Sequence, residues 1–232
     1  MKSVYNRLEK TEAGFTENGH LLEEQLIGTI NSRLYKQLAY TYLHREEIEG
    51  DGLDITAKYE RTLIAREKSE SSFVTVMDFK KTEIPLNIAM NLVEKCQTEN
   101  PEAPKKIFSR KLLEGVKGGF EDKYIFKFFT ASGGTHLDIC NGIDGYFKLY
   151  DKETKKRLAT ATIDLTSNPN KINTPADLLI YISKEDTFRL DNSRGNEKFD
   201  PAFLDELISK EKVRVINTLV NSFLERKEKN KI

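Results

Sequence analysis

Apolar residues recur at helical spacing near both ends of this chain. In the first 50 residues an apolar side chain stands at every fourth position, namely at Leu22, Leu26, Ile30, Leu34 and Leu38. This spacing gathers apolar side chains on one face of a helix, which the turn residues 50–52 end. A second long stripe follows Asp200 and Pro201 and runs from Phe203 to Leu224. We therefore expect an amphipathic helix at each end of the chain.

Two shorter helical patterns lie between these ends. Pro85 marks the start of the first, whose apolar face comprises Leu86, Ala89, Leu92, Val93 and Cys96. The second comprises Ile107, Leu112, Leu113 and Val116, and the glycine pair 118–119 ends it. The polar, proline-bearing stretch from Gln97 to Lys106 separates the two and is the best internal boundary. It predicts a mainly helical region over residues 1–100 and an α/β core over residues 101–232.

Strand patterns fill much of the second half. Two apolar stretches flank the charged connection from Asp151 to Arg157, which predicts a β-hairpin. Residues 176–182 predict a further strand, and residues 120–129, with four Phe and one Tyr, predict a core strand or helix. Earlier, residues 59–68 are compatible with a helix and residues 72–79 alternate like a strand. The chain is therefore expected to form an α+β or α/β fold, with a central mixed β-sheet flanked by helices and extra helices at both termini.

An acidic residue stands near one end of each hairpin strand. Asp144 precedes the first apolar stretch, and Asp164 closes the second. In a hairpin these two carboxylates would face each other across neighbouring strands. Carboxylate oxygens in that arrangement suit Mg²⁺ or Mn²⁺, which prefer hard oxygen ligands and keep several waters.

The run from Phe120 to Ile182 resembles the core of the PD-(D/E)xK nuclease superfamily. In that family an Asp on one strand and an acid-x-Lys triplet on the next bind the metal and orient the attacking water. Asp144 matches the first Asp, and Asp164 matches the acid of the triplet. The resemblance implies a restriction-endonuclease-like fold, Mg²⁺ or Mn²⁺ as cofactor and DNA as substrate. Position 166 is Thr where the family has Lys, so Lys171 is the candidate replacement, and Thr166 could at most hold a water.

Further acidic residues are secondary candidates. Some members of the family carry an additional acid on their first helix, a role that Glu114 or Glu121 could fill here. A glutamate on a helix is more often a solvated surface residue. Asp138 lies just upstream of Asp144 and could reach a metal or a phosphate. Structural hydrogen bonding is the alternative for Asp138.

Charge narrows the possible partners. The chain has 37 basic and 37 acidic residues, and this zero net charge disfavours coating of DNA through bulk electrostatics. Five cations nevertheless gather in and beside the hairpin connection, where we expect them next to the metal site. They form either a nucleic-acid-binding patch or a solvated turn. These cations are Lys148, Lys152, Lys155, Lys156 and Arg157.

Composition describes a soluble globular protein, with 38% hydrophobic and 32% charged residues. No run of about 18 apolar residues is present, and the N-terminus lacks the apolar block of a secretion signal. We expect no membrane partner and a cytoplasmic location, or a virion if the source is a phage. The two cysteines, Cys96 and Cys140, do not stand at a metal-ligand spacing.

Two functions from different classes fit these observations. The first is a metal-dependent DNA endonuclease or exonuclease. The second is a catalytically inactive nuclease-like fold that serves as a structural component of a larger assembly, such as a phage virion or connector. In that case the terminal helices would contact protein partners or form an oligomer. A nucleic-acid-binding factor without catalysis is a third reading. The threonine at position 166 and the zero net charge favour the second class.

Overall fold

The computed structural model describes residues 25–28, 30–43, 84–131, 135–190 and 197–229. Its centre is an open, mixed four-stranded sheet in the order β1-β2-β3-β4. The first three strands pair antiparallel, and β4 pairs parallel to β3. The strands are β1 (Tyr124–Thr130), β2 (Gly145–Asp151), β3 (Arg157–Thr166) and β4 (Leu178–Tyr181). The predicted hairpin, the strand after it and the mixed sheet are therefore confirmed.

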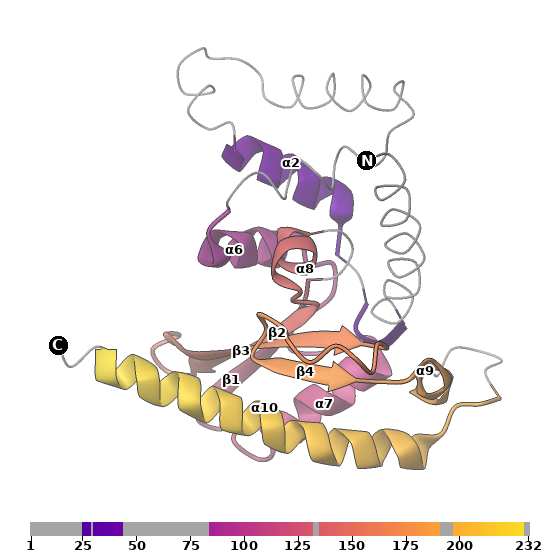
Figure 1. Cartoon of the computed structure of the whole chain (residues 1–232). Helices are drawn as coiled ribbons and strands as arrows, with labels where there is room; N and C mark the ends of the chain where they lie inside the picture. Colours follow the sequence, from indigo (N-terminus) through magenta and orange to yellow (C-terminus); the bar gives the residue numbers. More distant parts are fainter. Residues whose placement is uncertain (1–24, 29, 44–83, 132–134, 191–196, 230–232) are drawn as a thin grey trace, which may run out of the picture.

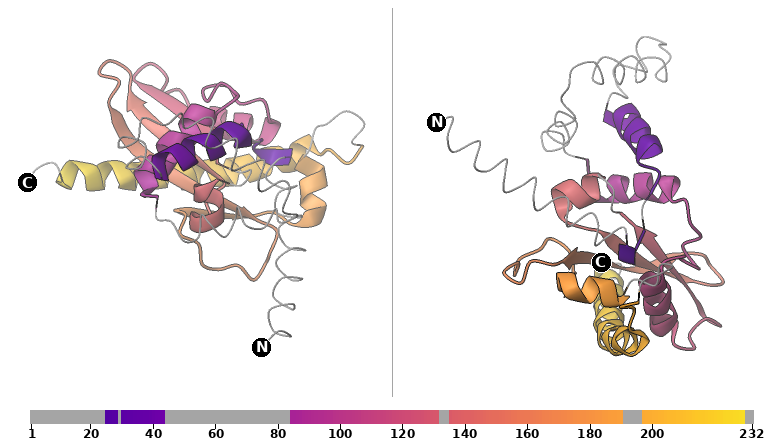
Figure 2. Two further views of the ribbon diagram at one scale, coloured as in Figure 1. Left: turned by 90° about the horizontal axis from the view of Figure 1, so that it is seen from above. Right: turned by 90° about the vertical axis from the view of Figure 1, so that its right-hand side faces the viewer.

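Helices cover both faces of the sheet, which makes this an α+β fold (Figure 1). On one side lie α6 (Leu86–Cys96) and α8 (His136–Asn141), with α2 (Ser32–Leu43) stacked on α6. On the other side lie α7 (Ile107–Lys117) and α10 (Pro201–Lys229). The right-hand view of Figure 2 shows these layers edge-on. The short helix α9 (Lys184–Leu190) follows β4 at the end of the sheet.

The larger core lies between the sheet and the pair α7 and α10. Odd-numbered residues of β2 and β3, such as Phe147 and Ile163, point into it. The predicted stripe of α10 supplies Leu204, Val215 and Leu219 from the other side. The helix begins after Asp200, whose Oδ1 accepts a hydrogen bond from the backbone N–H of Phe203 at 3.0 Å.

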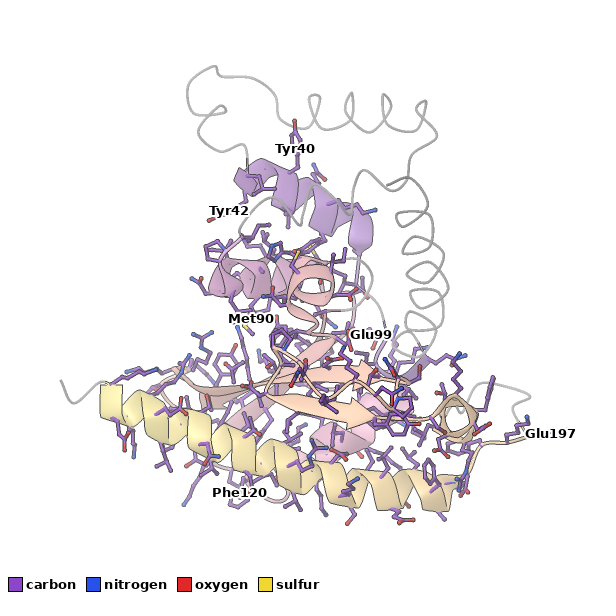
Figure 3. All side chains as sticks on the ribbon, viewed as in Figure 1. Tyr40, Tyr42, Met90, Glu99, Phe120 and Glu197 are labelled. Atoms are coloured by element: carbon purple, nitrogen blue, oxygen red, sulfur yellow. The ribbon has the colours of Figure 1, made fainter. Side chains whose placement is uncertain are left out.

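A second core lies between the opposite face of the sheet and α2, α6 and α8. Tyr146 of β2 is fully buried there, and its hydroxyl donates to the backbone carbonyl of Met90 at 3.0 Å. Figure 3 shows Met90 between α6 and the sheet. Even-numbered residues of β2 and β3 thus face α6 and α8, and this alternation sets the surroundings of Lys148, Asp164 and Thr166.

One N-terminal helix, ended by residues 50–52, was expected, and over the described residues this expectation is wrong. Gly28 adopts a left-handed backbone conformation, with φ of 87°, and α2 begins only at Ser32. The break divides the residues of the apolar stripe between the two cores. Leu26 enters the core on the α10 side, whereas Ile30 enters the core on the α6 side.

The aromatic run 120–129 is resolved in favour of a strand, β1, with Phe120 left half-exposed before it. The segment predicted as a boundary, 97–106, covers the free edge of β1, because the N–H of Phe128 donates to the carbonyl of Pro101 at 2.8 Å. The predicted helix at 59–68 and strand at 72–79 lie outside the described residues. Within the described part of the chain, no helix is both long and apolar enough to cross a membrane.

Candidate active site

The open end of the β2–β3 hairpin brings Asp144 and Asp164 close together. Gly145 pairs with Ile163, and the N–H of Asp144 donates to the carbonyl of Ile163 at 2.9 Å. Asp144 immediately precedes this terminal pair and Asp164 immediately follows Ile163, so the two residues flank the end of the ladder. Oδ2 of Asp144 lies 2.6 Å from the backbone nitrogen of Leu165, the residue after Asp164, so the two carboxylates are neighbours. Both side chains are buried, on the face that α6 and α8 cover.

Asp144 is held by the neighbouring strand. Its Oδ2 accepts a hydrogen bond from the backbone N–H of Leu165 at 2.6 Å. Burial raises the pKa of Asp144 well above its ordinary value, and the negative charges of Asp138 and Asp164 raise it further. The Leu165 hydrogen bond and the positive charge of Lys171 act in the opposite direction. Burial and the neighbouring carboxylates therefore make the ionised form of Asp144 costly.

Lys171 reaches back to Asp164 from the loop after β3. Its Nζ donates to Oδ1 of Asp164 at 2.8 Å and lies 2.6 Å from Oδ2, the latter without hydrogen-bond geometry. The Asp164 side chain is 2% exposed and that of Lys171 is 34% exposed. The cation thus enters the buried pair from the solvent side.

Thr166 shapes the loop that makes this contact possible. It lies two residues after Asp164 on the same face, and its hydroxyl accepts from the N–H of Asn168 at 3.1 Å. The carbonyl of Asn168 then accepts from the N–H of Lys171 at 3.2 Å. These bonds turn the chain back toward β3. The loop thereby brings Lys171, five residues after Thr166, to the carboxylate of Asp164.

Asp138 approaches the pair from α8. Thr135 caps this helix at its N-terminus, and Gly142 ends it in a left-handed conformation. A Cβ atom added to Gly142 would lie 3.7 Å from Oδ2 of Asp164, so the end of α8 lies against that carboxylate. Asp138 is close enough to raise the pKa of Asp144. The structure therefore brings Asp138, Asp144, Asp164, Thr166 and Lys171 into one neighbourhood.

The two glutamates considered as a further acid lie elsewhere. Glu114 is exposed on α7, which packs against the opposite face of the sheet. Glu121 is exposed in the turn before β1, where its backbone carbonyl accepts a hydrogen bond from Nζ of Lys152. Neither is brought to Asp144, because the helix and the turn that carry them belong to other parts of the fold.

The cations of the hairpin connection are not beside the aspartates, contrary to expectation. Asp144 precedes β2 and Asp164 is near the end of β3, so both stand at the open end of the hairpin. Lys152, Lys155 and Lys156 are exposed at its closed end. Seven residues of strand, about 23 Å at ~3.3 Å per residue, separate the two ends.

Lys148 is not a surface cation either. It points toward α6, is 2% exposed, and its Nζ forms an ion pair with Oε1 of Glu94. Burial lowers the pKa of Lys148, although the bond to Glu94 opposes this shift. The reason is strand alternation, which directs Lys148 to the same covered face as Tyr146. Sequence analysis missed Glu94, whose only signal was its position on the predicted helix 86–96.

The aspartate pair offers two carboxylates to a divalent cation. Among the described residues, no three His, Cys, Asp or Glu side chains converge as a metal-ligand group. Two carboxylates are nevertheless sufficient for Mg²⁺, which is commonly held by one or two carboxylates and several waters. Burial raises the pKa of Asp144, and two neighbouring carboxylates raise it further. A bound cation would offset the repulsion among these negative charges. The donor set fits a hard divalent ion that retains water ligands.

Comparison with protein-family models, with curated proteins and with solved structures gave no match to this chain.

Proposed function

We propose that this protein is a metal-dependent DNA nuclease of the PD-(D/E)xK type that hydrolyses phosphodiester bonds. The observation that supports the proposal is the proximity of the buried carboxylates of Asp144 and Asp164 at the open end of the hairpin, with the Lys171 ammonium on Asp164. Two carboxylates and a lysine are the groups that this chemistry requires. Their order along the chain also matches the resemblance, apart from the displaced lysine.

Each residue has a defined part in this proposal. Asp144 and Asp164 would hold Mg²⁺ or Mn²⁺, with Asp144 kept in orientation by the Leu165 N–H. A bound divalent ion supplies a water of lowered pKa and positive charge for the phosphoryl oxygens. The ammonium of Lys171, half-exposed at the edge of the pair, would orient the attacking water and offset negative charge that develops at phosphorus. Asp138 would add negative potential that favours the cation.

A second function is favoured by a specific observation. Both aspartates already have partners within the protein, namely the Leu165 N–H and Lys171, so the pair is compatible with a purely structural role. The long helix α10 also leaves three apolar side chains about half-exposed, Val213, Val220 and Leu224. In this alternative the chain is an inactive nuclease-like fold within a larger assembly, with protein contacts through its terminal helices.

Cleavage assays distinguish the two functions. The full chain is incubated with supercoiled plasmid and with single-stranded DNA in Mn²⁺, alongside Asp164→Ala and the control Asp122→Ala. Asp122 is exposed in the turn before β1, so its substitution removes a carboxylate without touching the pair. The nuclease proposal expects cleavage by the wild type and the control, and a loss of at least about 100-fold in Asp164→Ala. Absence of cleavage in all three, together with a defined oligomer in light scattering, would support the structural alternative.

A further inference from the structure

Among the residues that the structure describes, no strand covers the outer edge of the first half of β3. β4 pairs only with the segment from Ile163 to Thr166. Before that, the N–H of Thr162 donates to Oδ2 of Asp177 at 2.8 Å, and the N–H of Thr160 donates to Oγ of Ser222 at 3.3 Å. Side chains, including one from α10, therefore close this edge.

Two arginines meet where α10 crosses this edge. Nη1 of Arg226 lies 3.5 Å from the backbone carbonyl of Arg157, a long hydrogen bond. The pairing shifts between Leu149 and Tyr150, which sets Arg157 opposite Tyr150 and hence on the Lys148 face. Both arginines are half-buried. Sequence analysis grouped Arg157 with the exposed cations of the turn, whereas its neighbour in space is a residue 69 positions away.

Positive charge at this place exceeds negative charge. Burial, and then the charge of Arg157, lowers the pKa of Arg226. Arg157 and Arg226 also contribute to lowering the pKa of Lys148, after the larger effect of burial. Guanidinium groups do not deprotonate in proteins, so both charges persist. Glu94 is already paired with Lys148, and no carboxylate of the described residues forms an ion pair with either arginine.

An unused hydroxyl lies beside the arginines. Thr160 stands opposite Lys148 in the ladder and three residues after Arg157. Its Oγ1 is buried and has no hydrogen-bond partner among the residues that the structure describes. The backbone N–H of Thr160 donates the hydrogen bond to Oγ of Ser222. Among the described residues, this edge of β3 therefore carries two arginines that form no ion pair and a threonine hydroxyl that forms no hydrogen bond.

We propose that Arg157 and Arg226, with Thr160 beside them, form a binding site for a phosphate group. Each guanidinium group presents a planar fork of N–H donors that matches phosphate oxygens, and a hydroxyl adds a further donor. The phosphate can belong to a nucleic-acid backbone or to a free phosphate compound. The site goes beyond the proposed nuclease function and does not require it. If the nuclease function and the phosphate site both hold, Arg157 and Asp164 lie about 23 Å apart along β3. This distance corresponds to roughly seven nucleotides along one strand of a duplex.

Two binding measurements test the site in the full chain, both in EDTA so that cleavage plays no part. The first compares the melting temperature in sodium phosphate with that in sodium chloride of equal ionic strength. The second measures the affinity for a fluorescent 20-base-pair duplex by anisotropy. The variants are Arg157→Gln and Arg226→Gln. Arg110→Gln is the control, because Arg110 is exposed on α7 and its substitution removes the same charge.

Phosphate is expected to raise the melting temperature of the wild type and the control, and to lose this effect in both variants. A backbone phosphate as ligand predicts in addition that each variant weakens duplex binding about 5-fold or more and lowers the salt slope by about one. Unchanged duplex binding with loss of the phosphate effect would assign the site to a free phosphate compound. Both variants should melt at or above the wild-type temperature in chloride, because they relieve repulsion.

The proposal is overturned if neither ligand distinguishes the variants from Arg110→Gln. It is also overturned if the variants melt lower in chloride yet respond to phosphate like the wild type, since the arginines would then only hold α10 to β3. Thr160→Val provides a variant that leaves both charges in place. Thr160→Val should reduce the rise of the melting temperature in phosphate without abolishing it. If phosphate raises the melting temperature of Thr160→Val and of Arg157→Gln as much as that of the wild type, the proposed site is contradicted. Loss of phosphate binding would leave the cleavage result at Asp164 unaffected, so the two proposals fail separately.

Discussion

Asp144 and Asp164 are alike in chemistry but are held by different partners. Asp144 accepts from a backbone N–H, whereas Asp164 pairs with the movable ammonium of Lys171. Burial and two neighbouring carboxylates make ionised Asp144 the costly member of the pair. A cation that enters the site would therefore relieve Asp144 most.

The cost of ionising Asp144 predicts a pH-dependent gain in stability for Asp144→Asn. The folded pKa is raised above the ordinary value of about 3.9. The stabilising contribution of Asp144 is thus full below about pH 4 and is lost as pH rises through the folded pKa. An asparagine oxygen still accepts from Leu165 and carries no charge. In EDTA at about pH 8, Asp144→Asn should melt about 2–4 °C above the wild type, equivalent to ~1 kcal/mol.

Melting curves between about pH 4 and pH 8 check this prediction, and the difference should shrink toward the acidic end. Asp164→Asn is the control, because it breaks the ion pair with Lys171 and should lower the melting temperature instead. A gain for Asp144→Asn that does not vary with pH would show that charge is not its cause.

The displaced lysine gives a prediction about catalysis. Lys171→Ala should reduce cleavage at least about 100-fold, because the ammonium at the pair is lost. Thr166→Lys in the same background returns an ammonium to the face of Asp164 and should recover at least about a tenth of the activity. Initial rates of plasmid nicking at saturating Mn²⁺ measure both. Ile172→Ala, next to Lys171 and highly exposed, is the control. Full activity of Lys171→Ala would remove the lysine from the mechanism.

At the scale of elements, the open end of the β2–β3 hairpin is fixed by a close approach between β1 and β2. A Cβ atom added to Gly145 would lie 2.8 Å from Cζ of Phe128 and 3.2 Å from the carbonyl oxygen of Phe129. Only glycine fits here without a shift of the strand or of the aromatic ring. Since Asp144 is the next residue, the position of its carboxylate depends on this fit.

Gly145→Ala is therefore expected to destabilise the protein by about 1–3 kcal/mol through overpacking. The predicted shift of β2 should also lower the activity proposed for the site. Urea denaturation measures the first effect and plasmid nicking the second. Gly115→Ala on α7 is the control, since its nearest contact is the flexible side chain of Lys212 at 3.3 Å, and its effect should stay within about 1 kcal/mol.

At the scale of the whole molecule, a buried ion pair joins α6 to the sheet. Glu94 of α6 pairs with Lys148 of β2, and Tyr146 adds a hydrogen bond to the Met90 carbonyl. These contacts cross the predicted boundary between residues 1–100 and 101–232. The helix that covers the aspartate face is thus attached through polar as well as apolar contacts.

A double-mutant cycle measures this attachment. Lys148→Met should cost about 2–4 kcal/mol, because it leaves Glu94 partly buried without its cation. Adding Glu94→Met should recover most of the loss, to within about 1 kcal/mol of the wild type. Urea midpoints of the wild type, both single variants and the double variant provide the four values. Additive losses would contradict the coupling.

Local patterns determined much of this protein from sequence alone. The alternation around residues 151–157 predicted the hairpin, and the apolar stripes predicted α6, α7 and α10. The acidic positions near the strand ends identified Asp144 and Asp164 as neighbours. These inferences hold because the helix and strand periods, and the pairing of a short hairpin, are properties of nearby residues. The family resemblance and the function remain proposals.

Tertiary structure decided what depends on distant contacts. The burial of Lys148 under α6 and the contact of Arg226 with Arg157 each join segments far apart in sequence. The break at Gly28 likewise depends on the tertiary structure, because it directs neighbouring residues into two different cores. The path of the loop after Thr166 likewise decided that Lys171 returns to Asp164. A residue pattern records which face a side chain takes on its own element. It does not record which other element covers that face, because that depends on how the whole chain packs.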